Sequence, residues 1–346
     1  MHKTDMASYS YKKGAAIVAF LTLVALNVSY TLATREPATS GLGEEAMKAR
    51  HEIWMVEYDR TYKDEAEKDH RFKVFKENIE FIERSNRAAR NGTYLLAINQ
   101  FADMSNEEFM AMYARSEPMP STTKNISGFK YVNVTLTEVP EEVDWIEKGA
   151  VTKIKNQKHC GCCWAFSAVA AVEGIHQIKT GELLSLSEQQ LLDCTNEKSD
   201  CSSGRKNLAF AYIIHNGGIA TEDAYPYTAE KGSCQSVKPV VKISGFEVVP
   251  TENEDALVAS VAHQPVAVGV EATKFQFYKS GVFPSKDCGP TPNHGLTVVG
   301  YGSHAGTKYW LLRNQWGESW GEEGYMRLER GTNACGIAKY GSYPVV

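Results

Sequence analysis

The first 159 residues of this 346-residue chain contain no cysteine, because all eight cysteines lie between Cys160 and Cys335. Neither sign of charge dominates: 37 Lys and Arg face 42 Asp and Glu, so the net charge is only -5. The chain therefore lacks the broad basic surface typical of nucleic-acid binding, and we expect no nucleic-acid partner. The composition, 43% hydrophobic and 23% charged, is that of a globular protein long enough for more than one core. The uneven cysteine distribution indicates a domain boundary between the cysteine-free N-terminal part and the cysteine-containing C-terminal part.

Long apolar runs are also missing after the N-terminus. Lys12 and Lys13 precede an apolar run from Ala15 to Val28, and Thr31-Leu32-Ala33 offers small residues for cleavage. The run is shorter than the roughly 20 residues that a membrane-spanning helix needs. The pattern therefore favours a secretory signal peptide over residues 1–33 rather than a membrane anchor. A secretory route favours disulfides, and it makes three sequons candidate acceptors for glycosylation: Asn91, Asn125 and Asn133.

Residues from Glu44 to Asn86 carry a helical pattern, which predicts a two-helix unit. Apolar side chains recur there in two sets: Ile53, Trp54 and Tyr58, and then Phe72, Phe75, Ile79 and Ile82. Six residues of the second helix also share one stripe: Glu67, Arg71, Phe75, Asn78, Ile82 and Asn86. A plain bundle helix would keep that stripe apolar, so its charged and amide residues predict specific polar contacts.

A short strand and a connector are predicted between the helical unit and the cysteine-containing part of the chain. Asn99, Phe101 and Asp103 alternate as in a short strand. The stretch from Met119 to Val139 is rich in Pro, Ser and Thr, which indicates an extended, exposed and cleavable connector.

The second half predicts helices followed by strands. Cys163 to Lys179 is apolar nearly all round and is stopped by Thr180-Gly181, which predicts a buried helix. Ser187 and Gln190 form a capping-box pattern for a further helix that ends at Asp193. β-Branched and aromatic residues then predict strands in four segments: Val266 to Val270, Leu296 to Tyr301, Tyr309 to Arg313 and Tyr325 to Leu328. A helical lobe followed by a sheet lobe predicts an α+β fold with a cleft between the lobes.

Cys163 lies where a loop meets the N-terminus of the predicted buried helix. The helix dipole and the unpaired N–H groups there favour the thiolate, which is the nucleophilic form. A cationic neighbour is still needed, and His294, at the start of an apolar strand, is the best placed of the nine histidines. In such a pair each charge stabilises the other, and the imidazolium protonates the leaving amine. The pattern predicts a cysteine nucleophile with His294 as its proton partner.

Two further polar residues extend this prediction. Asn314 is placed to hold the imidazole through its amide oxygen, with Trp316 and Trp320 shielding that hydrogen bond from water. Gln157 lies shortly before Cys163, so we expect its side-chain NH2 to join the Cys163 backbone N–H in an oxyanion hole.

Other interpretations of these residues are weaker. Cys163 alone would more often be a buried residue or half of a disulfide, and only its context favours a nucleophile. No second C-x-x-C pair follows the cysteine-rich run, so we expect no metal and no cofactor. A thiol redox protein is disfavoured because adjacent Cys162 and Cys163 make a strained disulfide. An inactive binding protein of this fold would lack one of the predicted catalytic residues, and all four are present. We interpret Glu173, on the buried helix, as a structural carboxylate.

Together these motifs resemble the papain family of cysteine proteases, in the subgroup of plant senescence-associated vacuolar enzymes. His294 and Asn314 follow Cys163 by about 130 and about 150 residues, as in that family. The stripe from Glu67 to Asn86 matches the ERFNIN signature of the family's inhibitory pro-segment. The segment Ala97-x-Asn99-x-Phe101-x-Asp103 matches its GNFD signature except at the first position, and Val139-Pro140 looks like a mature N-terminus.

The resemblance implies a zymogen with three parts: a signal peptide over residues 1–33, a helical inhibitory pro-segment with its connector over 34–138, and a two-lobe papain-like catalytic domain over 139–346. It implies an endopeptidase that hydrolyses peptide bonds through a thiolate–imidazolium pair and an acyl-enzyme, in vacuolar or lysosomal protein breakdown or, alternatively, outside the cell. The implied partners are protein or peptide substrates, its own pro-segment and cystatin-like inhibitors, and the implied state is a monomer. The implied disulfides are Cys160 with Cys201, Cys194 with Cys234, and Cys288 with Cys335.

The resemblance also implies a pocket for P2, the second substrate residue before the scissile bond. The implied substrate-binding residues are Gly204, Arg205, Lys206, Gly269, Pro292, Gly295 and Tyr340. Relatives usually carry apolar residues where Arg205 and Lys206 stand, and two interpretations stay open. Either both side chains extend outward and the pocket is apolar, or one cation faces the pocket and favours an acidic P2 or P3. Gln315 and Cys162 both stand where the family usually has serine.

Overall fold

The computed structural model of the chain describes residues 43–88, 92–114, 129–195 and 199–346. The predicted signal peptide, the sequons at Asn91 and Asn125, and the first part of the predicted connector lie outside the described residues. The chain divides into two units, one ending at Arg50 and the other running from His51 to Val346. Helix α2 (Glu44–Glu57) begins in the first unit, and all other elements lie in the second.

The predicted two-helix unit is present, because α3 (Glu65–Ala88) follows α2. Phe75, Ile79 and Ile82 are buried on α3, as is Trp54 on α2. The apolar face was predicted wrongly at Ile53, which is 50% exposed. Ile53 and Trp54 are consecutive, and consecutive helical side chains point in different directions, so only one of them faces inward.

The polar stripe of α3 makes the specific contacts that were predicted. Arg71 donates through Nη1 to both carboxylate oxygens of Glu108 at 2.9 Å. The side-chain NH2 of Asn78 donates to the carbonyls of Ala102 and Met104, each at 2.9 Å. Asn86 bonds the backbone of Leu96 in both directions. The stripe therefore fixes the chain that follows α3 against that helix.

The strand predicted over Asn99 to Asp103 was wrong, since those residues form a turn. The Asn99 side chain accepts from the backbone N–H of Phe101 at 3.0 Å, which stabilises the turn in place of a strand. The strand of this region is β1 (Tyr94–Leu96), which pairs antiparallel with β5 (Tyr278–Phe283). Helix α4 (Asn106–Tyr113) follows, and its N-terminus carries a capping box between Ser105 and Glu108.

The described end of the predicted connector is not fully exposed. Tyr131 is buried and its ring stacks on His263 with centroids 4.5 Å apart. The composition predicted an extended, exposed segment, whereas the described residues 129–139 run largely in turns, and Tyr131 with its partner anchors them.

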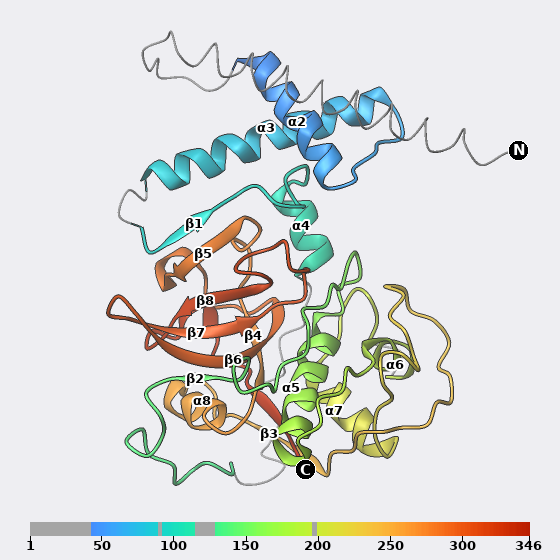
Figure 1. Ribbon diagram of the computed structural model, residues 1–346, viewed down its shortest axis with the longest axis vertical. Helices are drawn as coiled ribbons and strands as arrows, with labels where there is room; N and C mark the ends of the chain where they lie inside the picture. Colours follow the sequence, from blue (N-terminus) through green and yellow to red (C-terminus); the bar gives the residue numbers. More distant parts are fainter. Residues whose placement is uncertain (1–42, 89–91, 115–128, 196–198) are drawn as a thin grey trace, which may run out of the picture. The chain divides into compact units, whose positions relative to one another are not determined.

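The helical lobe is built around α5 (Cys163–Thr180), with α6 (Glu188–Cys194) and α7 (Lys206–His215) packed near it (Figure 1). Gly181 ends α5 in the left-handed conformation with φ 78°, as its place in the sequence predicted. Ser187 caps α6 by accepting from the Gln190 backbone, whereas the Gln190 side-chain oxygen accepts from Ala220 instead of closing a capping box.

The sheet lobe runs in the order β1-β5-β8-β7-β6-β4-β9-β3, and β2 pairs with β6. Its remaining elements are β2 (Val143–Asp144), β3 (Gly245–Val248), α8 (Glu254–Val261), β4 (Val266–Val270), η1 (Ser285–Asp287), β6 (His294–His304), β7 (Thr307–Arg313), β8 (Tyr325–Glu329), η2 (Ala334–Gly336) and β9 (Ser342–Val345). All four predicted strands are present. Helix α5 packs against β6, and this contact joins the two lobes along the helix that begins at Cys163 (Figure 1).

Candidate active site

Cys163 is the first residue of α5 and is fully buried. The start of β6 lies directly beside it: a Cβ added at Gly295 would stand 3.0 Å from the Cys163 carbonyl oxygen. Burial raises the pKa of the Cys163 thiol to about 11, against the opposing effects of the Gly295 and Trp164 backbone and of the Lys206 charge.

His294 is the first residue of β6 and is also buried. Its Nε2 lies 3.0 Å from the Asn314 side-chain oxygen, which also accepts the backbone N–H of Gln315 at 2.9 Å. Because that oxygen only accepts, Nε2 carries a hydrogen. Burial lowers the pKa of His294 to about 4, although the Asn314 hydrogen bond and the Tyr113 backbone oppose it. His294 Nδ1 has no hydrogen-bond partner among the described residues.

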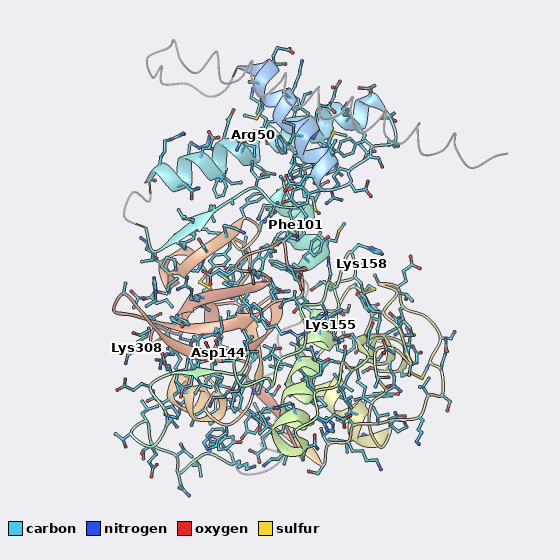
Figure 2. The ribbon with its side chains drawn as sticks, viewed as in Figure 1. Arg50, Phe101, Asp144, Lys155, Lys158 and Lys308 are labelled. Atoms are coloured by element: carbon cyan, nitrogen blue, oxygen red, sulfur yellow. A yellow bond between two sulfur atoms is a disulfide. The ribbon has the colours of Figure 1, made fainter. Side chains whose placement is uncertain are left out.

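Aromatic rings cover the histidine. Trp316 packs on the His294 ring with centroids 4.7 Å apart, and Trp320 meets Trp316 edge-on at 4.9 Å. Phe101 and Phe109, from the region predicted as pro-segment, meet the Trp316 ring at 5.8 and 5.0 Å. Phe101 is labelled in Figure 2. The two tryptophans shield the imidazole, and the N-terminal region adds to that shield.

The raised pKa of Cys163 and the lowered pKa of His294 both favour the neutral thiol and the neutral imidazole in this form of the chain.

Gln157 is buried in the loop before Cys163 and bonds the segment after β7. Its Nε2 donates to the Cys160 carbonyl at 2.9 Å, and its Oε1 accepts from Gln315 Nε2 at 3.0 Å. One N–H of the Gln157 amide is left, which an oxyanion hole requires.

The sequence had not assigned Tyr227 to the site. Its hydroxyl donates to the Gln157 carbonyl at 2.7 Å and lies 3.0 Å from Cys162 Sγ. No local motif marks Tyr227, because its contact partners lie far away in the sequence. Gln315 departs from the family motif, and its position directly after Asn314 is the sequence signal that points to a place in the site.

The residues expected around the substrate lie in two groups. A Cβ added at Gly269 would stand 3.2 Å from Pro292 and 3.6 Å from Tyr340, so these three residues meet at one wall. A Cβ at Gly204 would stand 2.2 Å from the ring of Trp164, the residue after Cys163. The structure thus brings Gly204 and Gly295 to the start of α5 from opposite lobes.

The two cations beside Gly204 differ in burial. Arg205 is the N-cap residue of α7 and is partly exposed, whereas Lys206 is only 6% exposed. Among the described residues, no hydrogen bond or ion pair of Lys206 is found. Burial lowers the pKa of Lys206 to about 8, and the Cys163 thiolate opposes this shift.

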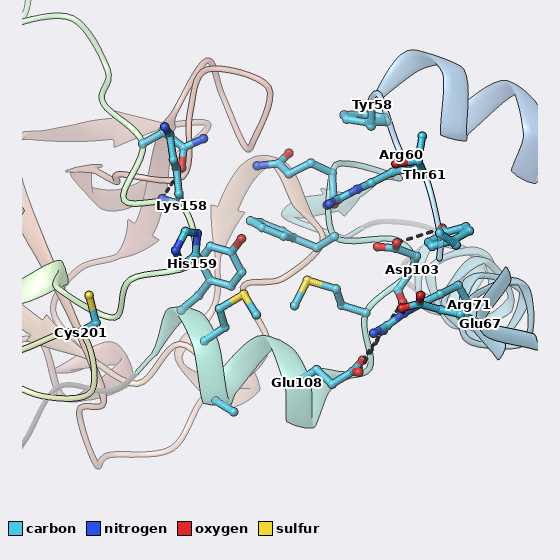
Figure 3. A pocket seen from close by; sticks show the side chains of 18 residues that line it. Tyr58, Arg60, Thr61, Glu67, Arg71, Asp103, Glu108, Lys158, His159 and Cys201 are labelled. Atoms are coloured by element: carbon cyan, nitrogen blue, oxygen red, sulfur yellow. Dashed lines mark hydrogen bonds and ion pairs between the residues drawn. The ribbon is translucent and has the colours of Figure 1, made fainter. Parts of the chain in front are cut away.

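A separate hollow of about 880 Å³ lies near the loop before α5 (Figure 3). It is lined by residues of the N-terminal region, such as Arg60, Asp103 and Glu108, and by Lys158 and His159. Neither Cys163 nor His294 lines it, so it is distinct from the candidate active site.

Three disulfides are present, and they are the pairs that the family resemblance implies: Cys160–Cys201, Cys194–Cys234 and Cys288–Cys335. Cys162 and Cys163 are both free and buried. Within the described ranges, no cluster of three or more His, Cys, Asp or Glu is arranged to hold a metal ion. In the same part of the chain, no helix has both the length and the apolar character needed to cross a membrane.

Two family models match the chain. The papain family cysteine protease model matches residues 139–345. The cathepsin propeptide inhibitor domain model matches residues 51–109, which contain α3 and the start of α4.

Named relatives match along nearly the full length. The senescence-specific cysteine protease SAG39 of Oryza sativa subsp. japonica is 49% identical, over 91% of this chain and 94% of its own. The senescence-specific cysteine protease SAG12 of Arabidopsis thaliana is 46% identical, over 87% of this chain and 90% of its own. The crystal structure of the proform of Amb a 11, a cysteine protease and ragweed pollen allergen, is 42% identical with a TM-score of 0.82, over 88% of this chain and 96% of that one.

These matches extend over both the cysteine–histidine centre and the N-terminal region that covers it. The chain therefore belongs to the papain family of cysteine proteases, and it is a zymogen that carries its own inhibitory propeptide.

Proposed function

We propose that the mature chain is an endopeptidase in which Cys163 is the nucleophile, His294 its proton partner, Asn314 the residue that orients the imidazole, and Gln157 an oxyanion donor. The observation that carries the proposal is the 3.0 Å bond from His294 Nε2 to Asn314. That bond holds the ring by one nitrogen and leaves Nδ1 without a described partner, on the strand whose second residue abuts Cys163.

In the proposed reaction the Cys163 thiolate adds to the substrate carbonyl carbon, and the carbonyl electron pair moves to oxygen. The remaining Gln157 N–H and the Cys163 backbone N–H, one of the unpaired donors of the first helical turn, stabilise that oxyanion. The C–N bond then breaks, and His294 gives its proton to the leaving amine. Water, deprotonated by His294, hydrolyses the thioester and restores the thiol.

Single substitutions test these roles. Cys163→Ser and His294→Ala should each abolish peptide hydrolysis while the protein still folds, and Asn314→Ala should be milder because it only orients the ring. Cys162→Ser is the matched control, since its thiol is the neighbouring free one and bonds Tyr227 rather than substrate. Near-normal turnover of Cys163→Ser, or loss of turnover in Cys162→Ser, would refute the assignment.

We infer that the pro-segment spans residues 34–138 and that processing occurs near Val139. Strand pairing of β1 with β5 and neutral amide contacts support its hold on the catalytic domain: Gln100 donates to the Trp316 carbonyl and Asn99 to the Gln276 carbonyl, each at 2.7 Å. These contacts have no carboxylate to protonate, so acid must act elsewhere.

The ion pair of Arg71 with Glu108 is the acid-sensitive element that we propose. Burial raises the pKa of Glu108, but hydrogen bonds from Ser105 and the Arg71 guanidinium outweigh it and hold the pKa below its usual value. A lowered folded-state pKa stabilises the fold above the ordinary carboxyl pKa and loses that effect as pH falls through the folded-state value. Acidification should therefore loosen α4, whose last residue Tyr113 has its backbone near His294. A precursor that is fully active at neutral pH without cleavage would contradict this.

We also propose a signal peptide over residues 1–33, a vacuolar destination with secretion from the cell as the alternative, and glycosylation at Asn133, which is exposed. The named plant senescence proteases support a role in bulk protein breakdown. We expect the enzyme to be a monomer. Its expected partners are protein substrates and cystatin-like inhibitors. Cell fractionation with glycosidase treatment tests the route, and a cytosolic, unglycosylated product would refute it.

For the P2 pocket, the burial of Lys206 favours the interpretation in which a cation faces substrate. A side chain that extended outward would be more than 6% exposed. With a pKa of about 8, Lys206 is charged below that pH and neutral above it. An ion pair of Lys206 with an acidic P2 or P3 residue, partly exposed on the substrate side, contributes up to about 1 kcal/mol, or roughly fivefold in kcat/KM.

The test is a matched substrate series with Leu, Phe, Glu or Arg at P2, measured at low and high salt and on both sides of pH 8. We expect Glu to gain relative to Leu only at the lower pH and low salt, and Arg205→Leu with Lys206→Met to remove the gain. A preference for Arg, or a Glu preference that survives the double substitution, would rule the cationic pocket out.

A further inference from the structure

Gln315 follows Asn314 directly and is only 4% exposed. Its side-chain nitrogen touches three groups: Gly295 O at 2.9 Å, Gln157 Oε1 at 3.0 Å and His294 Nε2 at 3.2 Å. One amide thus contacts the oxyanion residue, the histidine and the backbone beside the nucleophile.

The chemistry of these partners dictates which way two amides face. The Gly295 carbonyl can only accept, so Gln315 must present its NH2 group there and not its oxygen. The second N–H of the same group then points to Gln157 Oε1, which is an acceptor. Gln157 is thereby forced to turn its own NH2 group to the opposite side.

A second backbone carbonyl secures the other end of this chain. Gln157 Nε2 donates one hydrogen to the Cys160 carbonyl at 2.9 Å, and its other hydrogen remains for an oxyanion. If Gln157 turned over, two oxygens would meet at Cys160 and two NH2 groups would meet at Gln315. Each reversal buries unsatisfied donors and acceptors, which is costly in a dry site.

Gln315 also affects the histidine. Both hydrogens of its NH2 group are used on Gly295 and Gln157, so the 3.2 Å contact with His294 Nε2 is not a hydrogen bond. It sets the positive end of an amide dipole beside the ring. The Gln315 backbone N–H meanwhile donates to the Asn314 oxygen at 2.9 Å, which keeps that oxygen turned toward His294.

We propose that Gln315 is a positioning residue that locks the Gln157 amide with its NH2 group toward the oxyanion, through a hydrogen-bond chain anchored on the Gly295 and Cys160 carbonyls. The inference rests on the proposed roles of Cys163 and Gln157. Serine, which the family motif has at this position, carries a single hydroxyl hydrogen and cannot donate to Gly295 and Gln157 together.

The test separates oxyanion stabilisation from thiolate formation. Full-length precursors of the parent, Gln315→Met and Gln315→Ser are converted by added pepsin, so that activation does not depend on the variant's own activity. Three quantities are measured: kcat and KM for a peptide amide, the affinity for a peptide aldehyde, and the rate of alkylation by iodoacetamide. The aldehyde adds Cys163 sulfur to its carbon and creates an oxyanion, whereas alkylation forms a C–S bond without one.

We expect Gln315→Met to lower kcat and aldehyde affinity together by about 10- to 100-fold, below the 10²–10³-fold effect of deleting an oxyanion donor outright. KM and the alkylation rate should stay within about twofold, and Gln315→Ser should fall between Met and the parent. In a Gln157→Ala background, Gln315→Met should have little further effect, because there is no amide left to orient.

A merely structural role gives a different pattern, in which alkylation falls in parallel with aldehyde affinity and the two substitutions act additively. That pattern, or a Gln315→Met enzyme with parental aldehyde affinity, overturns the proposal. Failure of the proposed function is distinct, since it appears as turnover that survives Cys163→Ser.

Discussion

Glu173→Gln should destabilise the fold, because each oxygen of this buried carboxylate accepts two hydrogen bonds. Glu173 lies on α5 and is 1% exposed. Its Oε1 accepts from Lys155 Nζ at 3.0 Å and from the Leu186 backbone at 2.9 Å. Its Oε2 accepts from Thr152 at 2.6 Å and from Arg313 at 3.1 Å. Lys155, labelled beside α5 in Figure 2, also bonds Glu188 at 2.8 Å.

The magnitude follows from counting acceptors and charges. A glutamine amide keeps one oxygen, so whichever way it turns, its NH2 group faces two donors. Lys155 and Arg313 then depend on Glu188, whose pKa burial and the Glu173 charge raise to about 8 in the parent. Breaking a buried ion pair by removing one partner costs about 3–5 kcal/mol. Arg313 retains the Lys153 carbonyl at 2.7 Å, so we expect the lower end, about 3 kcal/mol.

The assay is urea unfolding of the precursor at pH 7, in a Cys163→Ser background that prevents self-cleavage. Glu182→Gln is the matched control, because Glu182 is exposed and its side chain should contribute almost nothing.

The effect should also depend on pH in one direction. Burial opposes ionisation of Glu173, but the charges of Lys155 and Arg313 outweigh it and lower its pKa. The stabilisation is therefore complete above the unfolded-state pKa near ~4.3 and is lost as pH falls through the folded-state value, so the difference from parent should shrink only in strong acid. A free energy of unfolding within about 1 kcal/mol of the parent at pH 7 would refute the reasoning.

Three further changes test other contacts. In the precursor the pKa of Cys163 is about 11, so iodoacetamide should alkylate this thiol roughly tenfold more slowly at pH 7 than in the processed enzyme. The alkylation rate of the precursor should still rise above pH 9. Equal rates in the two forms would contradict the burial argument. Arg71→Met should raise the inhibition constant of the separate pro-segment by about tenfold at pH 7 and flatten its acid dependence, because it removes the nitrogen that donates to both Glu108 oxygens. Arg84→Met, at a 63% exposed side chain, should not, and equal effects of the two would argue against the acid-sensitive pair. Gly204→Ala should lower the free energy of unfolding by about 1–3 kcal/mol, since its Cβ would stand 2.2 Å from the Trp164 ring. Gly245→Ala, with open space around it, is the control. A Gly204→Ala protein as stable as the parent would show that the ring can move aside.

Most of the helices and strands of the catalytic region could be predicted from local sequence patterns. The helix from Cys163 is apolar nearly all round and ends at a glycine that adopts a left-handed conformation, and both signals are contained in consecutive residues. The same kind of local pattern misled at Asn99 to Asp103, where alternation suggested a strand. There the Asn99 side chain bonds the backbone of Phe101, and local hydrogen bonding of this type competes with strand pairing.

The sequence by itself was enough to propose the chemistry, because Cys163, His294, Asn314 and Gln157 stand out by residue type, spacing and their place at the ends of helices and strands. It could not determine what surrounds those groups. The burial of Lys206, the Tyr227 hydroxyl on the Gln157 carbonyl, and the reach of Gln315 across to Gly295 all join residues far apart in the chain. Which donor meets which acceptor in a dry site depends on how two lobes pack against each other, and only the tertiary structure decides that packing.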